Sequence, residues 1–172
     1  MIQTRRLARE IACQALYSMD LRSDWSRSAT KDFFDYFFSE ASLLSGDGTV
    51  SSELRDKQHR DFAIDLVNGV STYREGLDEL LSLVSTRWSI PRMLPVDRNI
   101  LRLASYELVF LSDIPSNVSI NEAIELAKRL GTDDSPTFVN GVLDKVSKII
   151  VAEPQKMTNL FPSLLEKKVE NS

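Results

Sequence analysis

Arginines near the N-terminus are the residues whose types and spacing could do chemistry. Arg5, Arg6 and Arg9 lie within about one and a half helical turns, and Tyr17 follows about two turns later. A guanidinium binds phosphate oxygens through two parallel hydrogen bonds, and a tyrosine ring offers a surface for an unstacked base. This spacing favours contact with RNA. The solvated polar face of an ordinary amphipathic helix would give the same pattern, so both interpretations stay open.

The chain offers little material for catalysis. It has one histidine, His59, and one cysteine, Cys13, which leave almost no material for a His/Cys metal site or a His-based triad. Its six glycines are too scattered for a phosphate loop or a dinucleotide fingerprint. Carboxylate-only or Ser-Lys chemistry leaves no short signature and stays open. The sequence therefore predicts a binding protein without cofactor or metal, in which His59 is a solvated helix residue.

The charge balance limits how nucleic acid could be held. The 172 residues carry 21 Lys+Arg against 25 Asp+Glu, a net charge of −4, with 42% hydrophobic residues. Such mild acidity argues against binding by bulk positive charge, although residues 1–27 carry five arginines against three acids. No apolar run approaches the roughly 20 residues that span a bilayer, and no signal peptide is recognisable. The single cysteine fits a reducing cytoplasm.

The elements that must position these residues are helices. Apolar residues recur at helical spacing, and no stretch alternates cleanly enough for a strand. In the first half the pattern predicts helices over roughly 4–20, 31–44, 55–70 and 73–87. In the second half three amphipathic stripes begin at Ile100, Ile120 and Val139. An all-α fold of about seven helices follows.

Several residues predict where these helices begin and end. Ser119 and Glu122 have the spacing of a capping box, and Asp134 is placed to cap the next helix. Gly131 could close the preceding helix in a left-handed conformation. Gly141 lies inside a helix, where glycine costs roughly 1 kcal/mol relative to alanine, so it indicates close approach of another backbone or a partner.

Side-chain directions within the first two helices can also be predicted. At about 100° per residue, one side of the first helix is apolar and carries Leu7, Ala8, Ile11, Ala12, Ala15 and Met19. The other side is expected to present Arg5, Arg6, Arg9, Glu10, Cys13 and Tyr17. In the second helix we interpret a dense aromatic run as core packing; its members are Phe33, Phe34, Tyr36, Phe37 and Phe38.

Longer segments resemble the NusB transcription antitermination family. The most specific are Val118–Lys128 and Phe138–Lys145, joined through Gly131 and Asp134-Ser135. Further matches are Arg5–Glu10 with Gln14–Tyr17, and Asp97–Arg102 with Tyr106–Leu108. The resemblance covers roughly residues 3–150, although 21–90 matches only in helical pattern.

The resemblance implies a fold of two packed helical bundles. It predicts a single NusB-like domain over 1–150, with an N-terminal bundle at about 1–90 and a C-terminal bundle at about 91–150. The tail, 151–172, has an apolar cluster that suits a short docked helix.

The resemblance also implies an adaptor rather than an enzyme. Family members bind the boxA element of leader RNA together with ribosomal protein S10, called NusE in this role. That complex joins RNA polymerase with other Nus factors and supports ribosomal RNA transcription. A cytoplasmic protein without cofactor or membrane contact is expected.

Carried over residue by residue, the resemblance assigns RNA contacts to Arg5, Arg6, Arg9, Gln14, Tyr17, Asp134 and Phe138. Leu7 stands where many relatives have another basic residue, so the resemblance implies an RNA contact that is weaker or that depends more on S10. Asp97 is assigned to the S10 contact, although an acid at a helix start also suits the helix dipole. Asp134 could equally be a helix cap, and Phe138 a peripheral core residue.

Three alternatives remain at this point. The chain could be the RNA-binding module of a ribosomal RNA cytosine methyltransferase, but it ends before a cofactor-binding α/β domain could begin. It could be a protein-only scaffold that has lost RNA binding, as Leu7 and the acidic balance would allow. Finally, some family members are monomers and others homodimers, and a dimer that buried the arginines would hide the RNA site.

Overall fold

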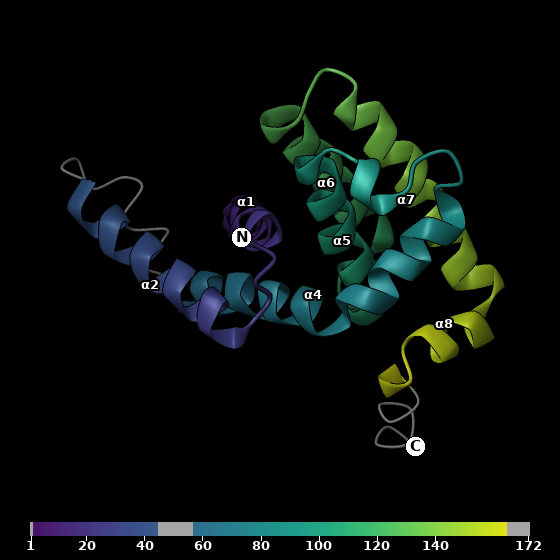
Figure 1. Cartoon of the computed structure of the whole chain (residues 1–172), viewed down its shortest axis with the longest axis horizontal. Helices are drawn as coiled ribbons and strands as arrows, with labels where there is room; N and C mark the ends of the chain where they lie inside the picture. Colours follow the sequence, from purple (N-terminus) through teal and green to yellow (C-terminus); the bar gives the residue numbers. More distant parts are fainter. Residues whose placement is uncertain (1, 45–56, 165–172) are drawn as a thin grey trace. The chain divides into compact units, whose positions relative to one another are not determined.

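The structure is a computed structural model that describes residues 2–44 and 57–164, with side chains for 5–39 and 57–164. Across those residues every secondary-structure element is a helix, which confirms the predicted all-α class (Figure 1). The helices are α1 (Ile2–Arg22), α2 (Arg27–Leu44), α4 (Lys57–Val84), the 3₁₀ helix η1 (Ile90–Arg92), α5 (Pro95–Phe110), α6 (Ser116–Leu130), α7 (Ser135–Ala152) and α8 (Pro154–Leu160). No helix in this described part is long and apolar enough to cross a membrane.

Helix α4 replaces two predicted helices. The chain forms two compact units, Met1–Ser71 and Thr72–Ser172, and α4 begins in the first and ends in the second. The predicted break between 70 and 73 is wrong because no proline interrupts the helix there, and buried apolar residues keep helical spacing through it. The helix ends at Val84, whose carbonyl accepts a hydrogen bond from Lys145 Nζ at 3.5 Å.

In the first unit, α1 packs against α2, and a short turn joins the two helices. Ser23 adopts a left-handed φ of 53°, and the Asp24 amide then donates to the Met19 carbonyl at 3.0 Å. Ser26 Oγ accepts from the Ala29 amide at 3.1 Å and so caps α2.

The aromatic residues of α2 do not all lie in the core. Phe34 is buried, but Tyr36 is 68% exposed, so the predicted core packing is wrong for Tyr36. Phe33 and Phe37 are half-buried, and their rings stack on each other with centroids 5.8 Å apart.

In the second unit, α5, α6 and α7 pack against one another. Ser119 is an interior residue of α6, not its cap, because Pro115 starts the helix about one turn earlier. The buried Ser119 hydroxyl donates to Glu107 Oε2 of α5 at 2.8 Å. The predicted capping box is therefore wrong, and its serine joins two helices instead.

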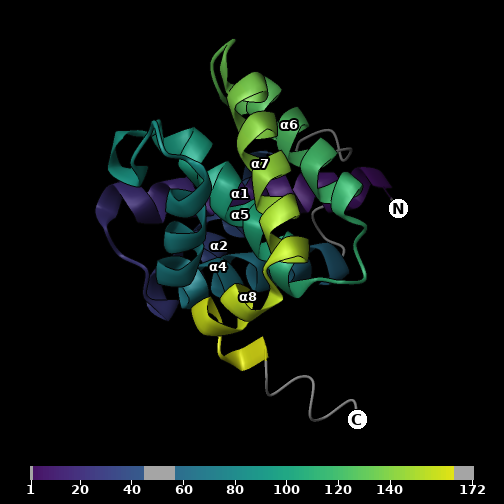
Figure 2. The same ribbon diagram turned by 90° about the vertical axis from the view of Figure 1, so that its right-hand side faces the viewer.

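The tail contains a short helix, α8, which follows directly on α7 in the second unit (Figure 2). Phe161, just after α8, is 1% exposed, and its ring lies edge-on to Phe110 with centroids 5.2 Å apart. A Cβ on Gly76 would lie 2.7 Å from the Phe161 ring and 2.9 Å from the Leu160 carbonyl oxygen. The absence of a side chain at Gly76 therefore makes room for Phe161.

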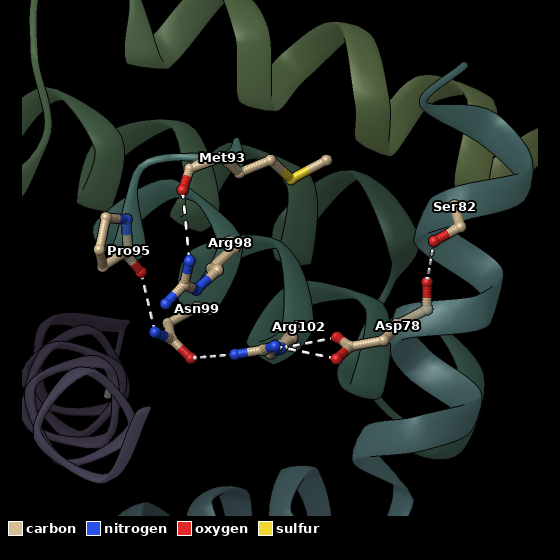
Figure 3. A network of polar contacts seen from close by, with 7 residues as sticks. All are labelled: Asp78, Ser82, Met93, Pro95, Arg98, Asn99 and Arg102. Atoms are coloured by element: carbon tan, nitrogen blue, oxygen red, sulfur yellow. Dashed lines mark hydrogen bonds and ion pairs between the residues drawn. The ribbon is translucent and has the colours of Figure 1, made fainter. Parts of the chain in front are cut away.

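A buried polar network joins α5 to the second half of α4 (Figure 3). The Arg102 guanidinium donates to both carboxylate oxygens of Asp78, at 2.7 and 2.9 Å, and to Asn99 Oδ1 at 3.1 Å. Asn99 Nδ2 donates in turn to the Pro95 carbonyl at 2.8 Å. Because the Arg102 side chain is only 4% exposed, this bidentate pair fixes the two helices against each other.

Candidate nucleic-acid interface

Helix α1 is buried around most of its circumference. The buried residues are Ala8, Arg9, Ile11, Ala12, Cys13, Ala15, Leu16 and Met19. The prediction that Arg9 and Cys13 lie on an exposed polar side is therefore wrong. Among the other residues of α1, we define the α1 strip as Arg6, Glu10, Gln14, Tyr17 and Leu21, which are all exposed or half-buried.

The three arginines do not form one cluster. Arg5 and Arg9 both lie over the Phe62 ring of α4, with guanidinium carbons 5.2 and 5.6 Å from its centroid. Arg5 is exposed, whereas Arg9 is only 3% exposed. Because Arg9 is buried, it is poorly placed to reach a phosphate from this position.

Arg6 belongs to the α1 strip. Tyr17 lies eleven positions further along the chain. Because each residue turns the helix by about 100°, the two side chains point in nearly the same direction from the helix axis. Tyr17 is 37% exposed, and Gln14, on the same strip, is exposed. The strip therefore combines one arginine, one amide and one aromatic ring about 16 Å apart from end to end.

The start of α7 is built by Ser135 rather than by Asp134. Asp134 has helical backbone angles, φ −84° and ψ −20°, and its side chain makes no capping hydrogen bond. Ser135 is 1% exposed instead, and its Oγ accepts from the Thr132 amide at 2.9 Å. The predicted Asp134 cap is wrong, and the Asp134 carboxylate is exposed.

Gly131 serves the same turn in an unexpected way. It has φ −94° and ψ −162°, so the predicted left-handed conformation is wrong. A Cβ at Gly131 would lie 2.5 Å from Ser135 Oγ and 2.8 Å from the Ala127 carbonyl oxygen. The glycine is thus required by close approach. The turn presents Asp134 and, one helical turn later, the half-buried Phe138 on one side of α7.

Asp97 lies beneath the surface. It is 4% exposed, and its Oδ1 has no hydrogen-bonding partner among the described residues. Burial raises the pKa of its carboxyl group, and a hydrogen bond from the Ser135 hydroxyl partly opposes that shift. Asp97 therefore supports the Gly131–Ser135 turn and does not present an exposed carboxylate.

Two residues of these surfaces were missed by sequence reasoning. Phe62 lies where the sequence resembles the family only in helical pattern, and its contact with Arg5 depends on the packing of α1 against α4. Ser135 carried a usable signal, because a serine just before a proline is a common helix-starting pair. The contact made by Phe62 became visible only with the fold.

These features define the class of protein: an all-helical chain whose candidate chemistry is recognition by arginine, amide and aromatic side chains. Across the described ranges no group of three His, Cys, Asp or Glu side chains could hold a metal ion. His59 is half-buried in α4.

Comparison with known proteins identifies the family. The model of the NusB family matches residues 6–148. The transcription antitermination protein NusB of Geobacter sulfurreducens is 46% identical over 146 residues, covering 85% of this chain and 95% of the relative. A NusB structure from T. maritima is 37% identical, with a TM-score of 0.67 over 84% of this chain and 90% of that one.

A further structure contains the antitermination factors NusB and NusE in complex with double-stranded RNA. It is 26% identical to this chain, with a TM-score of 0.68 over 86% of this chain and 98% of that one. The chain belongs to the NusB family, which consists of transcription antitermination proteins and not of enzymes.

Proposed function

We propose that this protein is a transcription antitermination factor that binds boxA-type leader RNA together with ribosomal protein S10 (NusE) and supports ribosomal RNA transcription. The observation that carries the proposal is the match in fold and length to the chain solved with NusE and RNA. The complex would join RNA polymerase with other Nus factors in the cytoplasm.

Helix α1 supplies the first set of proposed contacts, from Arg5 and from the α1 strip. Arg5 and Arg6 are accessible and would bind phosphates, while Gln14 would reach a base edge and Tyr17 would stack on a base. Arg9 is 3% exposed, so we assign it an indirect role, holding Phe62 beneath Arg5. The RNA contact of α1 then rests on fewer cations than the motif suggested.

The start of α7 supplies the second set. The exposed Asp134 carboxylate would accept a hydrogen bond from a base edge, and Phe138 would offer a ring edge for stacking. Asp97 is buried, so its proposed effect on S10 binding is indirect, through the position of the Gly131–Ser135 turn.

The test is binding of the purified chain to fluorescent boxA RNA, with and without S10, over a range of salt concentrations. We expect weak binding alone, tightened by S10, with a shallow salt dependence because few phosphates are contacted. Replacing Arg5 and Arg6 together by alanine should lower both affinity and salt slope, by roughly 0.7 in the slope per lost phosphate contact.

The matched control is Lys31→Ala, which removes an exposed cation that already pairs with Asp35 at 2.5 Å. Affinity that responded neither to S10 nor to the arginine replacements would overturn the proposal. S10 binding without any RNA contribution would instead support a protein-only scaffold, which the burial of Arg9 makes the second candidate. Light scattering with and without RNA would test whether a homodimer competes with binding.

A further inference from the structure

Gly141 lies inside α7, where nothing described in the fold requires a glycine. A Cβ at Gly76 or Gly131 would collide with neighbouring atoms, but a Cβ at Gly141 would have no described atom within 4 Å. Glycine is less favourable than alanine in a helix interior because it loses more backbone freedom on folding. The position is exposed, so it leaves a bare stretch of helix that an outside molecule can approach closely.

Gly141 also lies in a row with recognition side chains. At about 100° per residue, Asp134, Phe138, Gly141 and Lys145 fall within about 60° of one another around α7. All four are exposed or half-buried. We call them the α7 row. From Phe138 to Lys145 it covers about 10 Å, and the neighbouring Asp144 carboxylate is paired with Lys148 at 2.7 Å.

The α7 row ends beside a basic segment that carries an exposed tryptophan. Lys145 Nζ donates to the carbonyl of Val84, and the segment after Val84 contains Arg87, Trp88 and Arg92. Trp88 is 49% exposed, and the Arg92 guanidinium carbon lies 5.7 Å from the centroid of its ring. Both arginines are exposed.

The charge of this segment, together with its exposed aromatic ring, favours nucleic acid over an apolar partner surface. Between Leu80 and Tyr106 the sequence has one acidic residue, Asp97, and that residue is buried. An exposed aromatic ring beside guanidiniums is the combination that holds single-stranded nucleic acid, since any base can stack on the ring and any phosphate can pair with the cations.

We propose that single-stranded RNA leaving Asp134 and Phe138 continues along α7 over Gly141 to Lys145, and from there to Arg87, Trp88 and Arg92. This inference rests on the proposed function, because it extends the RNA contact at the start of α7. It makes Gly141 a place where the RNA backbone passes close to the helix. It also assigns to Lys145 and Arg92 phosphate contacts that the N-terminal arginine motif does not include.

The test compares binding of two RNAs: one of boxA length, and the same RNA extended at both ends. Gly141→Ala should raise the thermal midpoint of unfolding by about 3 °C, because alanine favours the helix and meets no neighbour. It should at the same time lower affinity for the extended RNA about threefold. A purely structural role for Gly141 predicts the first change without the second.

Two further variants locate the path. Trp88→Ala should lower affinity for the extended RNA about tenfold, and Lys145→Ala about threefold, with little change for the short RNA. Their controls are Tyr36→Ala, which removes an exposed ring of α2, and Lys128→Ala, which removes an exposed lysine paired with Glu125. Affinity for S10 should stay unchanged throughout.

The outcomes separate this inference from the proposed function. If Arg5, Arg6 and Phe138 variants weaken both RNAs but Gly141, Lys145 and Trp88 variants weaken neither, the extended path is wrong and the proposed function stands. If the latter variants weaken S10 binding and spare RNA, the surface belongs to a protein contact. If no variant affects either RNA, the proposed function itself fails.

Discussion

The two candidate surfaces are built by opposite means. In α1 most of the helix is buried, and a narrow strip with Arg6, Gln14 and Tyr17 is what remains. At the start of α7 a buried turn made by Gly131 and Ser135 carries the exposed Asp134. In the first case packing buries Arg9, which the helical pattern placed on the exposed side. In the second, packing leaves Asp134 exposed, because the buried Ser135 holds the turn through the Thr132 amide.

The difference teaches that a motif residue can serve a surface without being on it. Arg9 and Asp97 both belong to segments that resemble the family, and both are less than 5% exposed. Their neighbours, Arg5 and Asp134, are exposed. At each surface, replacing one buried and one exposed residue therefore distinguishes a residue that stabilises the surface from a residue that contacts RNA directly.

The largest effect is expected in α1, from Arg9→Ala. Removing a buried charged side chain should lower the free energy of unfolding by about 3 kcal/mol, because its interaction partners stay buried without it. Arg5→Ala, the exposed counterpart, should cost less than about 1 kcal/mol. Urea denaturation measures both. An Arg9→Ala chain as stable as the wild type but deficient in RNA binding would place Arg9 in direct contact with RNA.

At the α7 turn, Gly131→Ala should lower the free energy of unfolding by about 2 kcal/mol. The new Cβ would lie 2.5 Å from Ser135 Oγ, so the turn must shift. Asp134→Ala should lower RNA affinity less in the Gly131→Ala variant than in the wild type, because Gly131→Ala has already displaced the Asp134 carboxylate. Equal effects of Asp134→Ala in both backgrounds would show that the turn does not position it.

The aromatic residues should differ between the surfaces. Tyr17→Ala should lower RNA affinity about tenfold, or about 1.4 kcal/mol, with little change in stability because the ring is 37% exposed. Phe138→Ala should lower affinity and stability together, since Phe138 is half-buried. Fluorescence anisotropy and thermal melts on the same samples provide the check; a Phe138→Ala chain that loses only stability would make Phe138 a core residue.

The smallest effect is expected from Asp97→Asn, which should raise the free energy of unfolding at neutral pH by about 1 kcal/mol. Burial raises the pKa of Asp97, so the folded state binds this proton more readily than the unfolded state. Stability therefore falls as pH rises through the raised pKa, and the penalty disappears as pH falls toward the ordinary value of 3.8. Urea titrations across pH should show the variant's advantage above that range only.

Helical periodicity was enough to predict the fold class, and family motifs were enough to predict the family. Apolar spacing identifies a helix because one stripe must be buried, whatever covers it. The same spacing does not reveal how much of a helix is buried. For α1 the apolar stripe predicted one buried side, and the structure buries Arg9 and Cys13 as well.

Helix ends were predicted less well, since several residues compete for each cap. Ser119 and Asp134 both have side chains that can cap, but Pro115 and Ser135 decide where α6 and α7 begin. Gly131 was singled out correctly as special but for the wrong reason, because close approach and left-handed conformation both require glycine. Only neighbouring atoms distinguish the two.

The close packing of the Phe161 ring against Gly76 has a consequence for the order in which the second unit can fold during synthesis. Tyr73 and Phe110 precede Phe161 in the sequence, so both rings are synthesised before the ring that packs edge-on against them. Until residue 161 has left the ribosome, Phe161 cannot pack against the Tyr73 and Phe110 rings of the second unit. The ring that covers this part of the second unit is thus translated after helices α4 to α7.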